Sequence, residues 1–166
     1  MQIKPYLNFD GRTEEALAFY KKAVGADIGL VMRYKDLPAG QPTMGSPTPD
    51  KIMHASFKVG DSVVFASDGR CASAAEFKGV TLSLSAKTDA EGEKLFKALG
   101  EGGKIQMPMA ETFFATRFGM LSDRFGLAWM VIVEKPMPKT AAAGKAPARK
   151  TPTRKAAAKK AGKRAG

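Results

Sequence analysis

The chain has 166 residues, which is enough for one domain with a sizeable apolar core. Its formal charge of +11 lies at one end: eleven of the 27 Lys and Arg residues fall in 135–166, where Asp and Glu are absent, and the other sixteen balance all sixteen acidic residues. This distribution excludes a basic domain and predicts a neutral body with a cationic tail. The single cysteine excludes an intramolecular disulfide and favours a reducing compartment. No apolar run has the length of a signal peptide core or a membrane span, so we expect a soluble cytoplasmic protein.

The first half of the body has the pattern of a strand, a helix and three strands. Thr13 can cap a helix that carries apolar residues at helical spacing and stops at Gly25. Residues 35–50 contain several Pro and Gly residues, which predicts a long irregular loop. Gly60 and Asp61 separate two apolar runs and indicate a hairpin. The predicted strands cover residues 2–9, 27–34, 51–59 and 62–67.

The second half repeats this pattern. The segment VTLSLSA alternates strictly between apolar and polar residues, which predicts a strand with one apolar face. Thr88 and Glu91 have the spacing of a capping box at the start of a helix, and Gly102 and Gly103 end that helix. SDRFG, at 122–126, is the predicted turn between the last two strands. The predicted strands cover residues 80–86, 104–109, 114–121 and 127–134.

A shift of 76 residues aligns the two halves, strand with strand and helix with helix. It places Tyr6 on Leu82 and Tyr20 on Phe96. The sequence therefore predicts an α+β fold built from two βαβββ modules. The predicted organisation is one domain at 1–134, with modules at about 1–68 and 79–134, and a disordered tail at 135–166.

Four pieces of the chain carry a family resemblance: PYLNFDG, EEALAFYKKAVGA, IMHASFKVGDSVVFASD and LFKALGEGGKIQMPMAETFFATRFGMLSDRFGLAWMV. Their order and spacing resemble the PhnB-like branch of the vicinal oxygen chelate superfamily, which holds glyoxalase I, bleomycin-resistance proteins and extradiol dioxygenases. The resemblance implies a curled mixed sheet in each half, a central cleft for a small molecule, and a homodimer. The branch has been labelled with a ubiquinone methyltransferase activity, but this sequence lacks a glycine-rich nucleotide loop that would hold a methyl donor.

Metal-using members of the superfamily place His or Gln on the first strand of each half and Glu on the last strand of each half. A divalent cation held there polarises oxygens of the substrate. Here the first-strand positions fall on Pro5 and on Val80 or Thr81, and the last-strand position of the second half falls on Met130. Residues 51–68 contain no Glu. Because these side chains are poor ligands for a hard cation, we expect no cofactor and no metal site of the usual kind.

His54 is the only histidine and lies in the piece MHASF, where the PhnB-like branch also carries a His. It is the candidate catalytic residue, as a general base, a hydrogen-bond partner of the substrate or a lone metal ligand. A structural histidine on a half-buried strand is the alternative. The second functional hypothesis is a metal-dependent glyoxalase- or dioxygenase-like enzyme with a displaced site around His54 and Asp68.

Five other side chains are candidates for binding the substrate. Arg117 would bind an anionic group through its planar fork, or else pair with an acidic neighbour at the surface. Asp68 would accept a hydrogen bond in the cleft, or else cap the following turn. Phe113 and Phe114 lie in a predicted loop and would close one end of the cleft, while Met130 would line its floor.

The tail is rich in Lys, Ala and Pro and has no aromatic residue, so it cannot bury enough apolar surface to offset the entropy of ordering. It resembles the tails of histone H1-like proteins, which implies non-specific, salt-sensitive contact with nucleic acid or another polyanion. A nucleoid-associated protein is the third functional hypothesis, and a merely solvated tail is its alternative. The candidate contacts are Lys145, Arg149, Lys150, Arg154, Lys155, Lys159, Lys160, Lys163 and Arg164.

Overall fold

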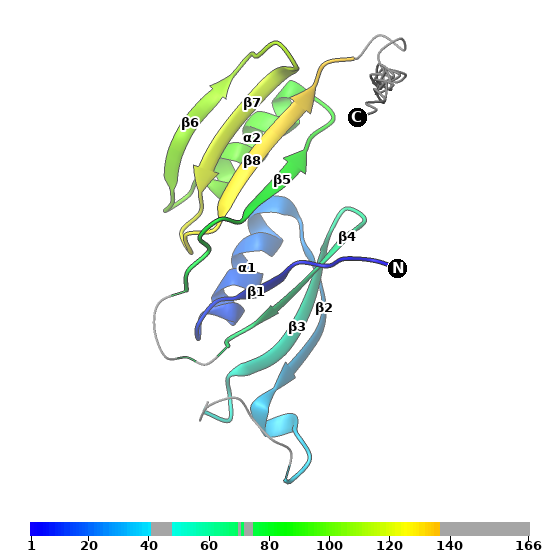
Figure 1. Ribbon diagram of the computed structural model, residues 1–166, viewed down its shortest axis with the longest axis vertical. Helices are drawn as coiled ribbons and strands as arrows, with labels where there is room; N and C mark the ends of the chain where they lie inside the picture. Colours follow the sequence, from blue (N-terminus) through cyan, green and yellow to red (C-terminus); the bar gives the residue numbers. More distant parts are fainter. Residues whose placement is uncertain (41–47, 70, 72–74, 137–166) are drawn as a thin grey trace, which may run out of the picture. The chain divides into compact units, whose positions relative to one another are not determined.

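The computed structural model describes residues 1–40, 48–69, 71 and 75–136, and it divides the chain into a compact body, Met1–Lys135, and a second unit, Pro136–Gly166. The predicted disorder of 135–166 falls almost entirely outside the described residues. No helix within the described ranges is long and apolar enough to cross a membrane. The elements of the body (Figure 1) are β1 Tyr6–Asn8, α1 Thr13–Val24, β2 Asp27–Arg33, a short 3₁₀ helix Tyr34–Asp36, β3 Ile52–Val59, β4 Ser62–Ser67, β5 Thr81–Ser85, α2 Asp89–Leu99, β6 Lys104–Ala110, β7 Ala115–Ser122 and β8 Ala128–Glu134.

The body contains two four-stranded mixed sheets, one from each module. The strand order is β1-β4-β3-β2 in the first sheet and β5-β8-β7-β6 in the second. In the first sheet β1 runs parallel to β4, and in the second sheet β5 runs parallel to β8. All other neighbouring strands are antiparallel. The hairpin predicted at Gly60 and Asp61 joins β3 to β4. These findings confirm the α+β fold of two βαβββ modules.

The internal repeat holds for the topology but not for the register of the first strand. In β1 the side chain of Leu7 is buried and that of Tyr6 is 50% exposed, whereas in β5 Leu82 packs against the core. The shift that aligns Tyr6 with Leu82 therefore pairs an outward side chain with an inward one. Successive strand residues point to opposite faces of a sheet, so an error of one residue in the alignment is enough to pair an outward side chain with an inward one. In the helices the same shift is correct, because Tyr20 and Phe96 are both buried.

A side chain distant in sequence caps the first helix. Arg12 precedes α1 without a side-chain cap, and the N–H of Thr13 donates to Oδ1 of Asp68 at 2.8 Å. Oδ2 of Asp68 accepts from the N–H of Ile52 at 2.7 Å. The predicted cap by Thr13 is therefore wrong, and the Thr13 hydroxyl is buried without a hydrogen-bond partner among the described residues. At the other end Gly25 adopts a left-handed φ of 66°, which confirms the predicted stop.

The second helix has a shifted capping box. The N–H of Glu91 donates to Oγ1 of Thr88 at 3.2 Å, as the sequence predicts. The carboxylate of Glu91 accepts from the N–H of Lys87 at 2.8 Å, which is one residue before the expected donor. Both bonds still satisfy backbone donors at the start of α2, where no carbonyl of the helix can reach them.

One buried carboxylate joins the two modules. Asp123 follows β7 and is only 3% exposed. Its Oδ1 accepts from the N–H groups of Phe125 at 2.9 Å and Leu127 at 3.1 Å, which closes the turn before β8. Its Oδ2 accepts from the hydroxyl of Tyr20 at 2.7 Å and from the indole N–H of Trp129 at 2.9 Å. Because Tyr20 lies on α1 and the other partners lie in the second module, this carboxylate is a polar link between the modules.

Aromatic packing surrounds this link. The ring of Tyr20 stacks on Phe57 with centroids 5.5 Å apart and contacts Phe9 and Trp129 at 6.0 and 5.7 Å. Burial, with the nearby carboxylate of Asp123, raises the pKa of Tyr20 far above its ordinary value. The hydroxyl therefore stays protonated and donates to Asp123 at every physiological pH.

Replacing Tyr20 by Phe removes one of the four donors to Asp123 and leaves a buried carboxylate oxygen with one partner fewer. We expect the free energy of unfolding to fall by about 1–3 kcal/mol. The matched control is Tyr6→Phe, which removes a half-exposed hydroxyl and is expected to cost less than about 0.5 kcal/mol. Urea unfolding, followed by the fluorescence of the single tryptophan, measures both values. Equal midpoints for the two variants would show that the link contributes nothing.

Candidate ligand-binding site

Each sheet has one face packed under its helix and one outer face. In the first sheet, the buried inward side chains are Leu7, Ala55, Phe57, Val64 and Ala66. Alternate strand residues point to opposite faces, and residues paired directly across two strands share a face. The outer face is therefore formed by Tyr6 and Asn8 of β1, Val63, Phe65 and Ser67 of β4, His54, Ser56 and Lys58 of β3, and Asp27 and Met32 of β2.

Three rings gather on this outer face, and we call Tyr6, His54 and Phe65 the ring cluster. The centroid of the His54 ring lies 5.0 Å from that of Phe65 and 5.8 Å from that of Tyr6, and Tyr6 lies 6.3 Å from Phe65. The hydroxyl of Tyr6 lies 3.4 Å from Nδ1 of His54, a long and weak contact. When this hydroxyl donates, the neutral imidazole carries its hydrogen on Nε2. The cluster thus offers aromatic surface and one group that can exchange a proton.

Lys4 adds a positive charge to the ring cluster. Its Nζ lies 5.0 Å from the centroid of the Phe65 ring, within the range of a cation–π contact. No carboxylate in the described part of the chain forms an ion pair with Lys4. The cation therefore sits at the rim of the cluster with its charge uncompensated by a side chain.

Hydrogen bonds brace the neighbouring part of the face. The hydroxyl of Ser67 donates to Oδ1 of Asn8 at 2.7 Å and accepts from the N–H of Gly69 at 3.2 Å. The hydroxyl of Tyr34 donates to the carbonyl of Gly69 at 3.3 Å. The strands that carry the ring cluster are therefore held to each other by side chains as well as by the sheet ladder.

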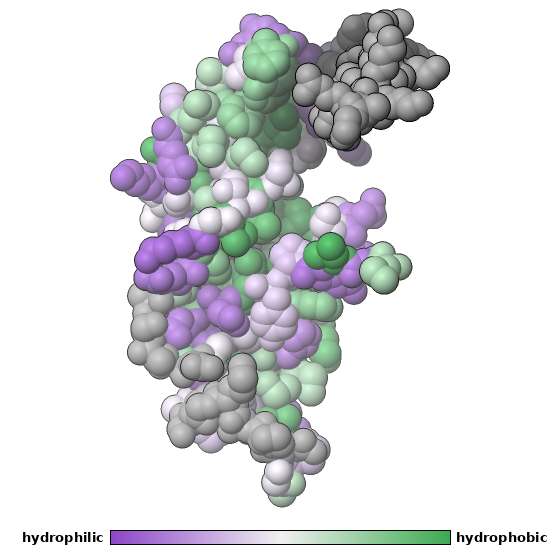
Figure 2. All heavy atoms as spheres, viewed as in Figure 1, coloured by the Kyte–Doolittle hydropathy of each residue, from purple (hydrophilic) through white to green (hydrophobic). Residues whose placement is uncertain are grey.

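On the outer face of the second sheet, β7 and β8 carry mostly apolar side chains, and we call Phe118, Met120, Ala128, Met130 and Ile132 the apolar face. Thr81, Ser83 and Ser85 of β5 border it on the same side of the sheet. Cross-strand pairs place Phe118 opposite Ile132 and Met120 opposite Met130, and all five side chains are partly exposed. Figure 1 shows α2 behind β7 and β8, so the view looks onto this face, and Figure 2 shows it covered mostly by hydrophobic side chains. At one end Phe114 packs edge to face on Phe118, with the ring centroids 5.3 Å apart.

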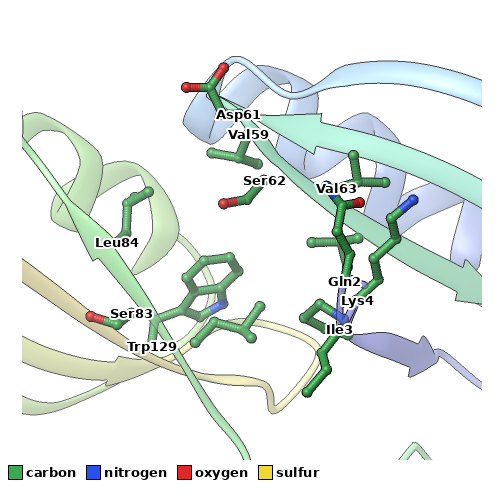
Figure 3. A pocket seen from close by; sticks show the side chains of 13 residues that line it. Gln2, Ile3, Lys4, Val59, Asp61, Ser62, Val63, Ser83, Leu84 and Trp129 are labelled. Atoms are coloured by element: carbon green, nitrogen blue, oxygen red, sulfur yellow. The ribbon is translucent and has the colours of Figure 1, made fainter.

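A cavity of about 440 Å³ lies between β5 and the N-terminal segment. Figure 3 shows Trp129 and Leu84 on one side of it and Ile3 and Lys4 on the other. Figure 2 shows the surface hollowed beside the same N-terminal segment. Most of the lining is apolar, and its polar members include Lys4, Asp61 and Ser62. Through Lys4 the cavity adjoins the ring cluster.

The predicted site residues do not gather in one place. His54 lies on the outer face of the first sheet, and Met130 lies on the apolar face of the second. Phe113 is 94% exposed and packs on Phe114 at 5.0 Å, at the edge of the apolar face. Arg117 points towards α2, where its Nε donates to Glu93 at 2.9 Å, and this bond raises the pKa of Arg117. Arg117 therefore pairs with an acidic neighbour at the surface, the alternative given for it above, and that neighbour lies on α2.

Asp68 has a structural role. It is 2% exposed, and both carboxylate oxygens accept hydrogen bonds from the backbone N–H groups of Thr13 and Ile52. The prediction that its carboxylate faces a ligand is therefore corrected, because the carboxylate is buried under the start of α1. The alternative role, a cap of the following turn, is closer to what the structure shows. Asp68 does cap backbone N–H groups, but the helix that it caps is α1, which precedes it in the chain.

The side chains present do not fit the divalent cation that the superfamily implies. Pro5 has no side-chain donor, and Met130 offers only a thioether, which hard cations avoid. The carboxylate of Asp68 is occupied by two backbone donors, so it cannot join His54 in a displaced site. Within the described ranges, three or more His, Cys, Asp or Glu side chains nowhere gather as a metal site requires. The hypothesis of a metalloenzyme at His54 and Asp68 is therefore not favoured.

Sequence reasoning missed three residues of the site: Lys4, Tyr6 and Phe65. The signal for two of them was present, because the strands YLN and SVVFAS alternate, and burial of Leu7 and Ala66 turns Tyr6 and Phe65 outward. No local pattern shows that the lysine before β1 folds over a ring of β4.

Comparison with known proteins places this chain and its fold in a family. Residues 1–132 match the family described as 3-demethylubiquinone-9 3-methyltransferase. Protein YjdN of Escherichia coli K12 is 34% identical over 145 residues, covering 83% of this chain and 99% of that protein. The crystal structure of PA1353 from Pseudomonas aeruginosa is similar with 44% identity and a TM-score of 0.71, covering 81% of this chain and 98% of that one.

A second solved structure is the putative 3-demethylubiquinone-9 3-methyltransferase, PhnB protein, from Bacillus cereus. It has 25% identity and a TM-score of 0.66, and the match covers 80% of this chain and 99% of that one. The fold alone extends to a glyoxylase/bleomycin resistance protein/dioxygenase domain from Frankia sp. EAN1pec, with 13% identity, a TM-score of 0.51, and coverage of 81% and 95%. The chain therefore belongs to the PhnB-like family of the glyoxalase and bleomycin-resistance fold, the family described as 3-demethylubiquinone-9 3-methyltransferase.

Proposed function

We propose that the protein binds a small molecule on the outer face of the first sheet, at Tyr6, His54 and Phe65. The observation that carries this proposal is the ring cluster itself: three rings, one of them the only histidine, lie within 6.3 Å of each other on rigid strands, partly exposed. Half-exposed rings supply apolar contact area at little cost in conformational entropy. His54 is the group best placed for proton transfer or for a hydrogen bond to the ligand.

The proposed activity does not rely on a metal at the superfamily's usual positions. Pro5 and Met130 stand where relatives carry ligands, and Asp68 is committed to the start of α1. We do not extend the methyltransferase name to this chain, because the sequence offers no glycine-rich loop for a nucleotide-like methyl donor. The comparisons support a PhnB-like protein of the glyoxalase fold, and the small-molecule site is our proposal for it.

We also propose a homodimer that covers the apolar face of the second sheet. Met120, Met130 and Ile132 are only partly buried, and Phe113 projects almost fully into solvent. Such a contiguous apolar surface on a monomer marks an interaction site. A second copy that covers it would also turn an open sheet face into the wall of a closed cleft.

The cationic tail is proposed to contact polyanions. Residues 135–166 carry eleven Lys and Arg residues and no acid, beside a body whose formal charge is zero. Without aromatic residues the tail lacks stacking platforms, so the contact depends on phosphate charge and not on base sequence. This property is independent of the ligand-binding face.

Replacing His54 by Ala is expected to weaken small-molecule binding at least about fivefold, because a ring contact and a hydrogen-bond partner are both lost. Ligand-observed NMR with a mixed fragment set identifies binders of the wild-type protein and ranks them against the variant. Lys97→Ala on α2 is the control, and EDTA treatment is expected to leave binding unchanged. A stoichiometric divalent ion whose removal abolishes fragment binding would overturn the metal-independent proposal.

Replacing Met130 by Lys places a charge at the centre of the apolar face and is expected to convert the dimer to a monomer. The control is Ile105→Lys, which adds the same charge at an exposed apolar residue opposite Leu121, on the helix side of the sheet. Light scattering coupled to size-exclusion chromatography reports the mass of each. A monomeric wild-type protein at all concentrations contradicts the dimer.

Removal of residues 136–166 is expected to abolish retention on immobilised double-stranded DNA at low salt. For the full chain, the logarithm of the binding constant is expected to fall linearly with the logarithm of salt concentration, with a slope of about −0.9 per phosphate contacted. Body and full chain are compared across a salt series on two unrelated DNA sequences. Equal retention with and without the tail would remove it from nucleic-acid binding.

A further inference from the structure

We propose that the ring cluster and Lys4 select planar anionic ligands, of which an aromatic carboxylate is the simplest. This inference rests on the proposed function, because it names the ligand class of the same face. The inference concerns two properties of the ligand: a flat shape, which the rings favour, and a negative charge, which Lys4 favours.

The rings favour a flat, unsaturated ligand. His54 and Tyr6 are tilted at 42° with centroids 5.8 Å apart, and both lie beside the ring of Phe65. A planar ring can stack on or lean edge-on against such a set, which adds to the simple burial of apolar area. A rounded aliphatic molecule of equal size gains only the burial.

The charges around the rings favour an anion. Lys4 lies over Phe65, and its Nζ has no carboxylate partner in the described part of the chain. In contrast, Lys35, Lys78 and Lys135 each pair with an acid at 2.8, 3.1 and 2.7 Å. A ligand anion beside Lys4 therefore gains an interaction without displacing an internal one.

The strands that carry the rings present no opposing charge, and the acid on the outer face, Asp27 of β2, lies opposite Lys58. The outward residues of β1, β3 and β4 are Tyr6, Asn8, His54, Ser56, Lys58, Val63, Phe65 and Ser67, which include no Asp or Glu. The charged side chain that contacts the rings is therefore that of Lys4. An anion is attracted here, whereas a ligand cation meets Lys4 at the rim.

The experiment compares three probes that share one ring: benzoate, benzyl alcohol and benzylamine. They are titrated into the full chain at physiological ionic strength, and binding is read from the ring proton signals of His54 by NMR. Because His54 is the only histidine, these signals report the ring cluster and not the cationic tail, which has no aromatic residue. Benzoate is expected to bind about threefold to fivefold more tightly than benzyl alcohol, with benzylamine weakest.

Two variants separate charge from shape. Lys4→Gln is expected to bring benzoate down to the affinity of benzyl alcohol, since only the charge preference is lost. Phe65→Leu is expected to weaken benzoate and benzyl alcohol by a similar factor. Lys94→Gln, on α2, is the matched control and leaves all three affinities unchanged. The fluorescence of Trp129, which points to the core, verifies that each variant is folded.

The failures of the two proposals differ. Equal binding of the three probes, weakened by the same factor in Phe65→Leu, overturns the anionic class and leaves the ligand-binding face in place. A benzoate preference that survives in Lys4→Gln also overturns the proposal. If none of the probes, and no member of the fragment set, shifts the His54 signals, the proposed function itself fails.

Discussion

The arrangement of this body depends on the carboxylate of Asp123. A buried charge is tolerated only when donors surround it, and here four donors converge on two oxygens. Two donors shape the turn before β8, and the hydroxyl of Tyr20 brings in the helix of the other module. The helix-covered sides of both modules are therefore joined around one polar point inside an aromatic core. This leaves the outer faces of the two sheets uncovered by the chain's own helices, and those faces are where binding chemistry is available.

A second buried carboxylate, that of Asp68, does the equivalent work inside the first module. It holds the start of α1 and the start of β3 through two backbone N–H groups. The residues on either side of it are then fixed, and Ser67 and Gly69 anchor Asn8 and Tyr34 at the edge of the outer face. Asp68, which the sequence suggested as a cleft residue, thus supports the outer face from the buried side of the sheet.

The sequence predicts the fold well because period, caps and turns agree over long segments. Gly25, the Gly60 hairpin and the Thr88 cap all stand as predicted, and the second strand–helix–strands unit follows the first. It fails where the partner is remote: Asp68 lies 55 residues from the N–H that it caps, and Tyr20 lies 103 residues from Asp123. Prediction of the candidate site fails for the same reason. His54 is recognisable as the only histidine in the sequence, whereas Tyr6 and Phe65 come from β1 and β4, and Lys4 comes from the segment before β1.

The two modules share a topology but differ in the chemistry of their outer faces. The first presents His54, two aromatic rings and an uncompensated lysine, while the second presents methionines, Ile132 and Phe118. The duplicated fold thus carries titratable and aromatic groups on one outer face and mostly apolar groups on the other, and the proposed binding roles of the two faces differ accordingly. Under the proposed function the first face decides which ligand is recognised, because a mispaired charge there is costly. The apolar face adds burial without demanding a specific partner, and its thioethers adapt to different shapes. Changes in ligand preference within such a fold are therefore expected to arise on the first face, with the second face free to vary in detail.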